Sequence, residues 1–375
     1  MIVALVLFVA LLILLAVGFP ISYALGFGAL SALVVKGSIP LMVVPQRLFA
    51  STDQFALLAV PFFILAGEIM LQGGISRRLV NFANDLLGWL AGGLALVSVA
   101  AATFFSAISG SSAATTAAIG SVMYPEMIKR GYRSDYAAVI QAVGGTLGVV
   151  LPPSIPFIIY GVITETSIGD LFLAGIFPGL LGALVYMALS WAICKRKGYG
   201  ERRASSIGYI GGENRSLWKS FWEAFPGLLM PVIVLGGIYG SIFTPTESAV
   251  VAVVYALLVS FVVYRELDYR KLFSLFNKAA LTSAMVMMLI AAASLFTWVM
   301  TIENMPRMIG NAVLALAGSK LVFLLLVNLI FLVTGMFLDT VAIILLLIPI
   351  FFPIAMQMGI DPVHFGVIAV FNLAV

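Results

Sequence analysis

The sequence predicts an all-α protein that crosses a lipid membrane several times. Hydrophobic residues make up 62% of the 375 residues and charged residues only 10%, whereas an ordinary soluble domain has about 25% charged residues. The mean hydropathy is +1.15. Apolar segments of membrane-crossing length recur along the chain, and the alternating pattern of a membrane β-barrel is absent from the sequence. These observations predict a polytopic helical membrane protein.

The composition also argues against several other classes. The single cysteine, Cys194, allows neither an internal disulfide nor a cysteine cluster for a metal. The single histidine, His364, gives a zinc enzyme or a Ser-His-Asp hydrolase almost nothing to work with. The net charge of +4 could suggest nucleic-acid binding. The positions of the basic residues relative to the apolar segments instead follow membrane topology, so we do not infer nucleic-acid binding.

Two halves of the chain repeat each other weakly across a polar linker at 195–219. The matching positions lie at a nearly constant separation and are Pro20 with Pro245, and Ser112, Pro125 and Gly131 with Thr340, Pro353 and Gly359. The order of apolar and amphipathic segments is also preserved. Repeats in transporters are commonly inverted, with binding sites at their interface near the membrane midplane. We therefore expect two inverted repeats, 1–200 and 220–375.

Each repeat is expected to contain scaffold helices, an interfacial helix, a re-entrant helical hairpin and a broken helix. Hairpins are expected around Gly110 and Asp339, where paired segments are too short to span alone. In the first repeat the elements are scaffold helices within 1–72 (at 2–17, 20–36 and 54–72), an interfacial helix at 75–88, a hairpin at about 90–130, a broken helix at 134–164 and a helix at 171–194. In the second they are scaffold helices within 221–300, the last at 279–300, an interfacial helix at 303–317, a hairpin at 319–357 and the start of a broken helix at 362–375.

The basic residues set the expected orientation. If the linker is cytoplasmic and each hairpin returns to its own side, every Lys and Arg faces the cytoplasm except Lys36, Arg47, Arg307 and Lys320, as the positive-inside rule requires. The first hairpin then enters from the cytoplasm and the second from outside, and the Met1 end lies outside. Because the second repeat stops early, we expect the natural chain to continue for roughly fifty residues beyond Val375.

The stretch from Ser106 to Ser154 is the strongest candidate site. Small hydroxyl residues surround Gly110, and a glycine and proline break interrupts the next apolar helix; the residues are Ser106, Ser109, Ser111, Ser112, Thr115, Thr116, Gly144, Gly145, Gly148, Pro152 and Pro153. Broken helix at membrane depth is tolerated only where protein, water or an ion satisfies the backbone. Such residues can serve close helix packing alone. Hydroxyl and carbonyl oxygens are nevertheless hard ligands suited to Na⁺, and half-helix N-termini favour an anion, so sodium is the expected ion.

Acidic residues give a second candidate. Asp339, followed by Thr340, lies at the expected tip of the second hairpin, and a carboxylate at membrane depth is costly and usually functional. Asp339 is expected to ligate a cation, to titrate or to orient a substrate hydroxyl. Glu247 follows Pro245 and Thr246, so it is explained as well by a helix start as by a ligand role. Glu68 and Glu165 are expected at the membrane interface.

With these segments together, the chain resembles the large membrane subunit of tripartite ATP-independent periplasmic (TRAP) transporters. The resemblance rests on GFPISYALG, VPFFILAGEIM, SAISGSSAATTAAIG, GGTLGVVLPPSIPFIIYG, GGIYGSIFTPTESA and GMFLDT. It implies a non-enzymatic, sodium-coupled importer of the bacterial inner membrane with an elevator-type fold, in which a transport domain carrying both hairpins slides against a fixed scaffold. It also implies C4-dicarboxylates, sialic acids or similar organic acids as substrates. The implied partners are a small four-helix membrane subunit and a periplasmic substrate-binding protein.

The resemblance also implies roles for particular residues. One sodium site would fall among Ser106, Ser109, Ser111, Gly145, Val149 and Pro152. A second would involve Gly335, Asp339 and Thr340, with the rest of its ligands beyond Val375. Substrate would lie between Ser109 or Ser111, Ser154 and Asp339. No transition metal is expected.

Two other interpretations stay open on the residues, and a third, an intramembrane hydrolase, is disfavoured because only one histidine, His364, exists and no histidine or lysine is expected near Ser111. The nearest is a self-sufficient sodium/carboxylate symporter of similar fold, which would need no binding protein. An intramembrane hydrolase would need a base beside a nucleophile such as Ser111. A channel would not concentrate its solute against a gradient.

Overall fold

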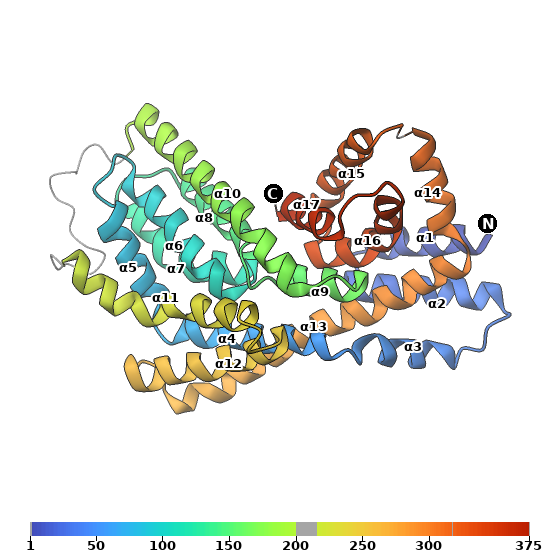
Figure 1. Cartoon of the computed structure of the whole chain (residues 1–375), viewed down its shortest axis with the longest axis horizontal. Helices are drawn as coiled ribbons and strands as arrows, with labels where there is room; N and C mark the ends of the chain where they lie inside the picture. Colours follow the sequence, from blue (N-terminus) through green and yellow to red (C-terminus); the bar gives the residue numbers. More distant parts are fainter. Residues whose placement is uncertain (1, 200–215, 317, 375) are drawn as a thin grey trace. The chain divides into compact units, whose positions relative to one another are not determined.

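The computed structural model describes residues 2–199, 216–316 and 318–374, and every regular element in these ranges is a helix (Figure 1). Within the described residues, seven helical stretches are long and apolar enough to cross a membrane: Phe55–Gln72, Ser134–Thr164, Ile168–Lys197, Leu217–Tyr239, Pro245–Val263, Tyr269–Ile302 and Thr340–Gln357. The predicted all-α polytopic class is therefore confirmed.

The helices belong to two compact units, which the chain enters more than once. Unit 1 contains the residues up to Leu58, Pro156–Leu171 and Leu281–Leu373, and unit 2 contains Ala59–Ile155 and Phe172–Ala280. Both units thus draw on both halves of the chain. The inverted relation of 1–200 and 220–375 stays a prediction, and most of the linker at 195–219 lies outside the described residues.

Unit 2 holds the first hairpin. Its helices are α4 (Ala59–Gln72), α5 (Ile75–Leu87), α6 (Gly93–Ser109), α7 (Ser112–Lys129), α8 (Ser134–Val150), most of α10 (Ile168–Lys197), α11 (Leu217–Tyr239) and α12 (Pro245–Leu258), which continues as a π-helical turn, Val259–Val263. Helices α6, α7 and α8 pack on one another, α5 packs on α6 and α11, and α4 packs on α12. The buried face of α6 is rich in small residues such as Ala95, Ala101 and Ala102, which allows helix axes to approach closely.

Unit 1 holds the second hairpin. Its helices are α1 (Ile2–Ala16), α2 (Ile21–Lys36), α3 (Val43–Thr52), a short 3₁₀ turn at Phe55–Leu58, most of α9 (Ile155–Thr164), the later part of α13 (Tyr269–Ile302), α14 (Met305–Leu316), α15 (Lys320–Gly335), α16 (Thr340–Gln357) and α17 (Pro362–Ala374). An ion pair of 2.6 Å joins Lys36 Nζ at the end of α2 to Glu303 Oε1. The Tyr160 hydroxyl donates to the Pro362 carbonyl at 2.7 Å, which ties α9 to α17.

Two features of these helices differ from the sequence expectation. Helix α3 was not predicted, because Pro45, Gln46 and Arg47 interrupt its apolar pattern; a proline in the first turn of a helix is nevertheless tolerated. Helix α13 begins at Tyr269 rather than at 279. Its first turns are basic and were excluded by hydropathy, yet Lys and Arg are good helix formers, and Lys278 pairs with Glu68 at 2.9 Å.

Glu247 marks a helix start. The Thr244 hydroxyl accepts from the Glu247 backbone N–H at 3.3 Å, and the Glu247 carboxylate accepts from the Thr244 backbone N–H at 2.8 Å. Pro245 occupies the first helical position of α12. This reciprocal arrangement is a capping box, so of the two roles considered for Glu247 the structure supports the helix start.

Removing this cap should lower stability modestly. Thr244→Ala is expected to cost about 1 kcal/mol, because it leaves the Glu247 N–H without its acceptor. Thermal unfolding of the purified protein in detergent measures the effect. Thr301→Ala is the matched control, since the Thr301 hydroxyl only bonds back to Thr297 in its own helix. Equal melting temperatures for the two variants would contradict the capping role.

Candidate functional site

The first hairpin turns at Gly110. Helix α6 ends at Ser109, and Gly110 has a φ of +62°, a conformation that favours glycine. Its N–H donates to the Ser106 carbonyl at 3.3 Å. Ser111 is extended, and its hydroxyl accepts from the Ala114 N–H at 3.4 Å, which caps α7. The tip therefore lies where the sequence predicted it.

The break between α8 and α9 covers Leu151 to Ser154. These four residues are all buried, although they belong to no helix. The Ser154 hydroxyl donates to the Val149 carbonyl, which satisfies one of the carbonyls freed at the end of α8. The helix is thus interrupted within 134–164, and the interruption is buried inside the protein.

The hairpin tip and the helix break touch each other. The Ile155 N–H donates to the Gly110 carbonyl at 3.2 Å. A Cβ on Gly110 would lie 2.6 Å from the Pro153 carbonyl oxygen, and a Cβ on Gly148 would lie 2.5 Å from the Ser111 carbonyl oxygen. Real Cβ atoms do not approach so closely, so glycine at these two positions is what allows each facing backbone oxygen to come so near. The two broken elements form one oxygen-rich site.

Hydroxyl groups complete this site. The Ser109 and Thr115 hydroxyl oxygens lie 2.8 Å apart, and both side chains are buried. The Ser106 side chain is fully buried, and its Oγ has no hydrogen-bond partner among the described residues. A buried polar atom without a partner is costly and calls for an unseen water or ion. The donor set is oxygen alone, which fits a hard cation such as Na⁺.

Four helix ends meet at this site: two are C-terminal ends and two are N-terminal ends. Helices α6 and α8 end at the site and present their terminal carbonyls, whereas α7 and α9 begin there. The C-terminal end of a helix carries partial negative charge and the N-terminal end partial positive charge. One site can therefore attract a cation on the carbonyl side and a carboxylate on the N–H side.

A buried polar bridge that the sequence reasoning missed holds these helices in register. The Ser98 hydroxyl on α6 donates to the Gln141 side-chain oxygen on α8 at 2.8 Å, and the Gln141 amide reaches Met127 Sδ on α7 at 3.5 Å. Ser98 and Gln141 are both buried. The one available signal was a lone amide within the apolar stretch of α8.

The second hairpin turns between α15 and α16. Asp339 is extended, and its carboxylate accepts from the Val341 N–H at 3.0 Å, so it caps α16. The Thr340 hydroxyl donates to the Leu373 carbonyl on α17 at 3.2 Å. Gly335 and Asp339 are exposed. Asp339 therefore has a structural role, capping, which the sequence reasoning did not anticipate.

The second helices of the two hairpins match closely. Helices α7 and α16 each have 18 residues, and each follows a residue whose side chain accepts from the first turn, Ser111 or Asp339. Pro125 and Pro353 occupy the same place within them, and Gly131 and Gly359 follow with φ of +83° and +67°. These correspondences support the repeat found in the sequence.

The predicted site residues thus fall into two groups. Unit 2 brings together Ser106, Ser109, Ser111, Gly145, Val149, Pro152 and Ser154, and unit 1 holds Gly335, Asp339 and Thr340. The assignment of sodium and substrate to both groups stays a prediction.

Comparison with known proteins decides the family. Residues 8–375 match the model of the DctM component of the tripartite ATP-independent periplasmic transporters. The chain belongs to this DctM family. It is 40% identical to the sialic acid TRAP transporter large permease protein SiaM of Vibrio cholerae, covering 96% of this chain and 83% of that protein. It is 38% identical to the C4-dicarboxylate large permease DctM of Rhodobacter capsulatus, covering 99% and 86%.

Two further similarities concern a longer relative and a solved structure. It is 46% identical to the isethionate TRAP transporter permease protein DctMQ of Oleidesulfovibrio alaskensis, over 96% of this chain but only 56% of that longer protein. The crystal structure of the Alcanivorax borkumensis YdaH transporter matches with a TM-score of 0.56 at 14% identity, over 89% of this chain and 76% of that one. The second likeness concerns the fold alone. This chain is accordingly a multi-pass transporter component.

Proposed function

We propose that the chain is the sodium-coupled permease subunit that imports a small organic acid anion. Sodium would bind at the meeting of the first hairpin and the α8–α9 break. The observation that carries the proposal is the fully buried Ser106 hydroxyl, unpaired among the described residues, one turn before the tip at Gly110. Sodium bound there would supply positive charge, which favours an anion as the transported solute.

The chain's own residues would divide the work. Ser106, Ser109 and Ser111, with the backbone of Gly145, Val149 and Pro152, would hold the first sodium ion. Gly335, Asp339 and Thr340 would contribute to the second. Ser154 with Ser109 or Ser111 would bind the substrate, whose anionic group would meet the N-terminal ends of α7 and α9. In this scheme the two hairpins move together as an elevator within the bacterial inner membrane.

The named relatives support an organic acid as substrate. Their names specify isethionate, sialic acid and C4-dicarboxylate. Each is an acid, although their sizes and hydroxyl patterns differ. The joint name DctMQ supports a small membrane subunit as one partner, and the tripartite family description supports a further component, which we propose is a periplasmic binding protein.

Uptake into proteoliposomes tests this function. The purified chain is reconstituted with and without the small subunit and the binding protein, and the uptake of radiolabelled carboxylates is followed under an inward sodium gradient. We expect concentrative uptake only with sodium and with both partners. Uptake that needs no binding protein would support the self-sufficient symporter instead, and passive equilibration would indicate a channel.

The Ser106 hydroxyl should set the sodium affinity. In Ser106→Ala the sodium concentration for half-maximal uptake is expected to rise roughly tenfold, because one buried oxygen ligand is lost. Substrate concentration is held saturating while sodium is varied. Ser121→Ala is the control, since the Ser121 hydroxyl lies on α7 and bonds to the Ala118 carbonyl. An unchanged sodium dependence in Ser106→Ala would remove Ser106 from the site.

A further inference from the structure

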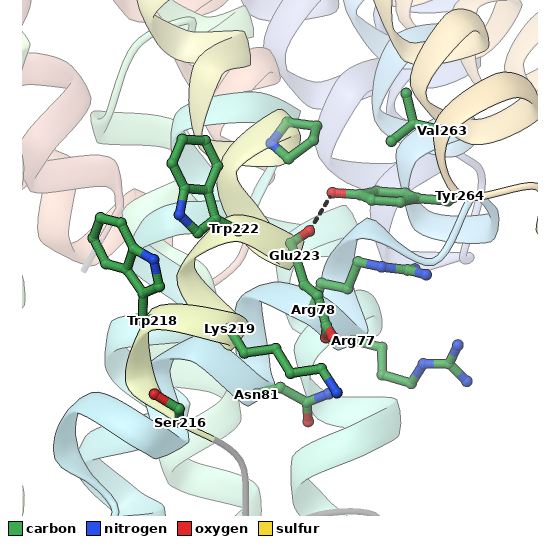
Figure 2. Close-up of a pocket in the computed structure, with 11 residues that line it drawn as sticks. Arg77, Arg78, Asn81, Ser216, Trp218, Lys219, Trp222, Glu223, Val263 and Tyr264 are labelled. Atoms are coloured by element: carbon green, nitrogen blue, oxygen red, sulfur yellow. Dashed lines mark hydrogen bonds between the residues drawn. The ribbon is translucent and has the colours of Figure 1, made fainter.

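A cavity lies in unit 2, and none of its lining residues belongs to the hairpin tip. It has a volume of about 1010 Å³ and is formed by α5, the first turns of α11 and the end of the π-helical turn after α12 (Figure 2). One end of each of two membrane-crossing stretches lies beside the cavity. These are the first residues of Leu217–Tyr239 and the last residues of Pro245–Val263. The end of a spanning helix lies at the level of the lipid headgroups, so the cavity is at the edge of the bilayer.

Basic side chains line one side of this cavity. They are Arg77 and Arg78 on α5 and Lys219 on α11. Arg77 and Arg78 share one carboxylate, Glu266, at 2.7 and 2.8 Å. Lys219 is exposed and forms no ion pair with any carboxylate in the part of the chain that the structure describes. With Glu223 also in the lining, basic groups still exceed acidic ones, so the cavity favours an anion.

Two tryptophans line the other side. Trp218 and Trp222 lie on α11 with 66% and 53% of their surface exposed. In Figure 2 their indole rings lie to one side, and Lys219, Asn81 and Arg77 lie to the other. Tryptophan is enriched at the membrane interface, where its ring contacts acyl chains and its N–H meets the headgroups. A ligand with an anionic headgroup and apolar chains fits a cavity with one basic side and one aromatic side better than a small soluble anion does.

Several contacts hold Arg78 and Tyr264 in the cavity lining. The Arg78 guanidinium lies 3.7 Å from the centre of the Tyr264 ring and donates to the Gly74 carbonyl at 3.0 Å. The Tyr264 hydroxyl donates to the Glu223 carbonyl at 2.7 Å. Burial raises the pKa of Tyr264 to about 12, so the hydroxyl keeps its proton at neutral pH. Arg78 is thus a structural residue, while Arg77, 60% exposed at its side chain, and Lys219 are available to a ligand.

We propose that this cavity binds the phosphate headgroup of an anionic membrane phospholipid, with Arg77 and Lys219 contacting the phosphate and Trp218 and Trp222 contacting the glycerol and upper acyl chains. The ligand is a lipid rather than a free phosphate, because the exposed indoles and the two adjoining spans give it a place for its chains. Neither the sodium site nor the transport cycle is needed for this binding.

Native mass spectrometry of the full chain in detergent tests the site. Phosphatidylglycerol and the zwitterionic lipid phosphatidylcholine are titrated in parallel, and glycerol 3-phosphate serves as a headgroup without chains. The wild type should bind phosphatidylglycerol in preference to phosphatidylcholine. Arg77→Gln and Lys219→Gln should each weaken phosphatidylglycerol binding roughly fivefold, since each removes one basic charge near the headgroup.

Two further variants separate lipid binding from folding and from general charge. Arg77→Lys keeps the charge and should keep the preference for phosphatidylglycerol. Lys271→Gln removes an exposed basic residue on α13 and should leave binding unchanged. Equal binding of both lipids, unchanged binding in Arg77→Gln and Lys219→Gln, or an equal loss in Lys271→Gln would overturn the proposal. Glycerol 3-phosphate binding as tightly as the lipid would overturn the lipid assignment in favour of a soluble phosphate ester.

Discussion

Gly148→Ala should abolish sodium-driven uptake. The added Cβ would lie 2.5 Å from the Ser111 carbonyl oxygen and 2.8 Å from the Thr115 hydroxyl oxygen. The Ser111 carbonyl is backbone and already accepts from the Thr115 N–H at 3.0 Å, so it cannot turn aside. Helices α7 and α8 would have to separate, which costs about 1–3 kcal/mol in a packed interior. Displacing the site's oxygens on the order of 1 Å is expected to lower the uptake rate about a hundredfold, by analogy with misplaced catalytic groups.

Gly236→Ala is the matched control for this result. Gly236 lies within α11 with no atom within 4 Å of its added Cβ, and alanine is favoured over glycine inside a helix by about 1 kcal/mol. Its uptake should equal that of the wild type. Initial rates are compared in proteoliposomes that hold equal amounts of folded protein, checked by thermal unfolding. If Gly148→Ala transported as well as Gly236→Ala, close contact between the hairpin tip and α8 would be irrelevant to transport.

The sequence predicted the interruptions of helices well because their causes are local. Gly110 permits a left-handed turn, whereas Pro152 and Pro153 restrict the backbone and lack an N–H donor, so both the tip and the α8–α9 break lie where expected. The helix start at Pro245 was likewise indicated by neighbouring residues, although the sequence left the role of Glu247 open between helix start and ligand. In each case the residues that cause the feature are adjacent in the chain, and no knowledge of tertiary structure was needed.

Features that depend on distant partners were not predictable in this way. The hydrogen bond between Ser98 and Gln141 joins residues on two different helices. The sequence of neither helix indicates which residue of the other it will contact. Helix α13 starts earlier than hydropathy indicates, because the helix continues through several basic residues. One of them, Lys278, forms an ion pair with Glu68. The unpaired state of Ser106 is also a tertiary property, because the sequence indicates a hydroxyl cluster but not which hydroxyl lacks a partner.

Asp339→Asn should stop uptake without weakening the fold. Asparagine caps helices as well as aspartate does, so the Val341 N–H, now 3.0 Å from the carboxylate, keeps an acceptor. Only the negative charge is lost. If that charge ligates sodium or orients the substrate, uptake should fall to background while the unfolding temperature stays within error of the wild type. Asp339→Ala should lose uptake too, and should also lose about 1 kcal/mol of stability with the cap.

Asp361 provides the comparison that makes this result specific. Its carboxylate accepts from the His364 N–H at 2.9 Å at the start of α17, in the same unit, and it is exposed like Asp339. Asp361→Asn removes an equal charge from an equivalent capping position and should transport normally. Sodium-driven uptake by Asp339→Asn at the level of Asp361→Asn would show that Asp339 serves only to cap α16. Because capping by aspartate and asparagine is nearly equal, loss of uptake in Asp339→Asn alone assigns the effect to charge at the second hairpin tip.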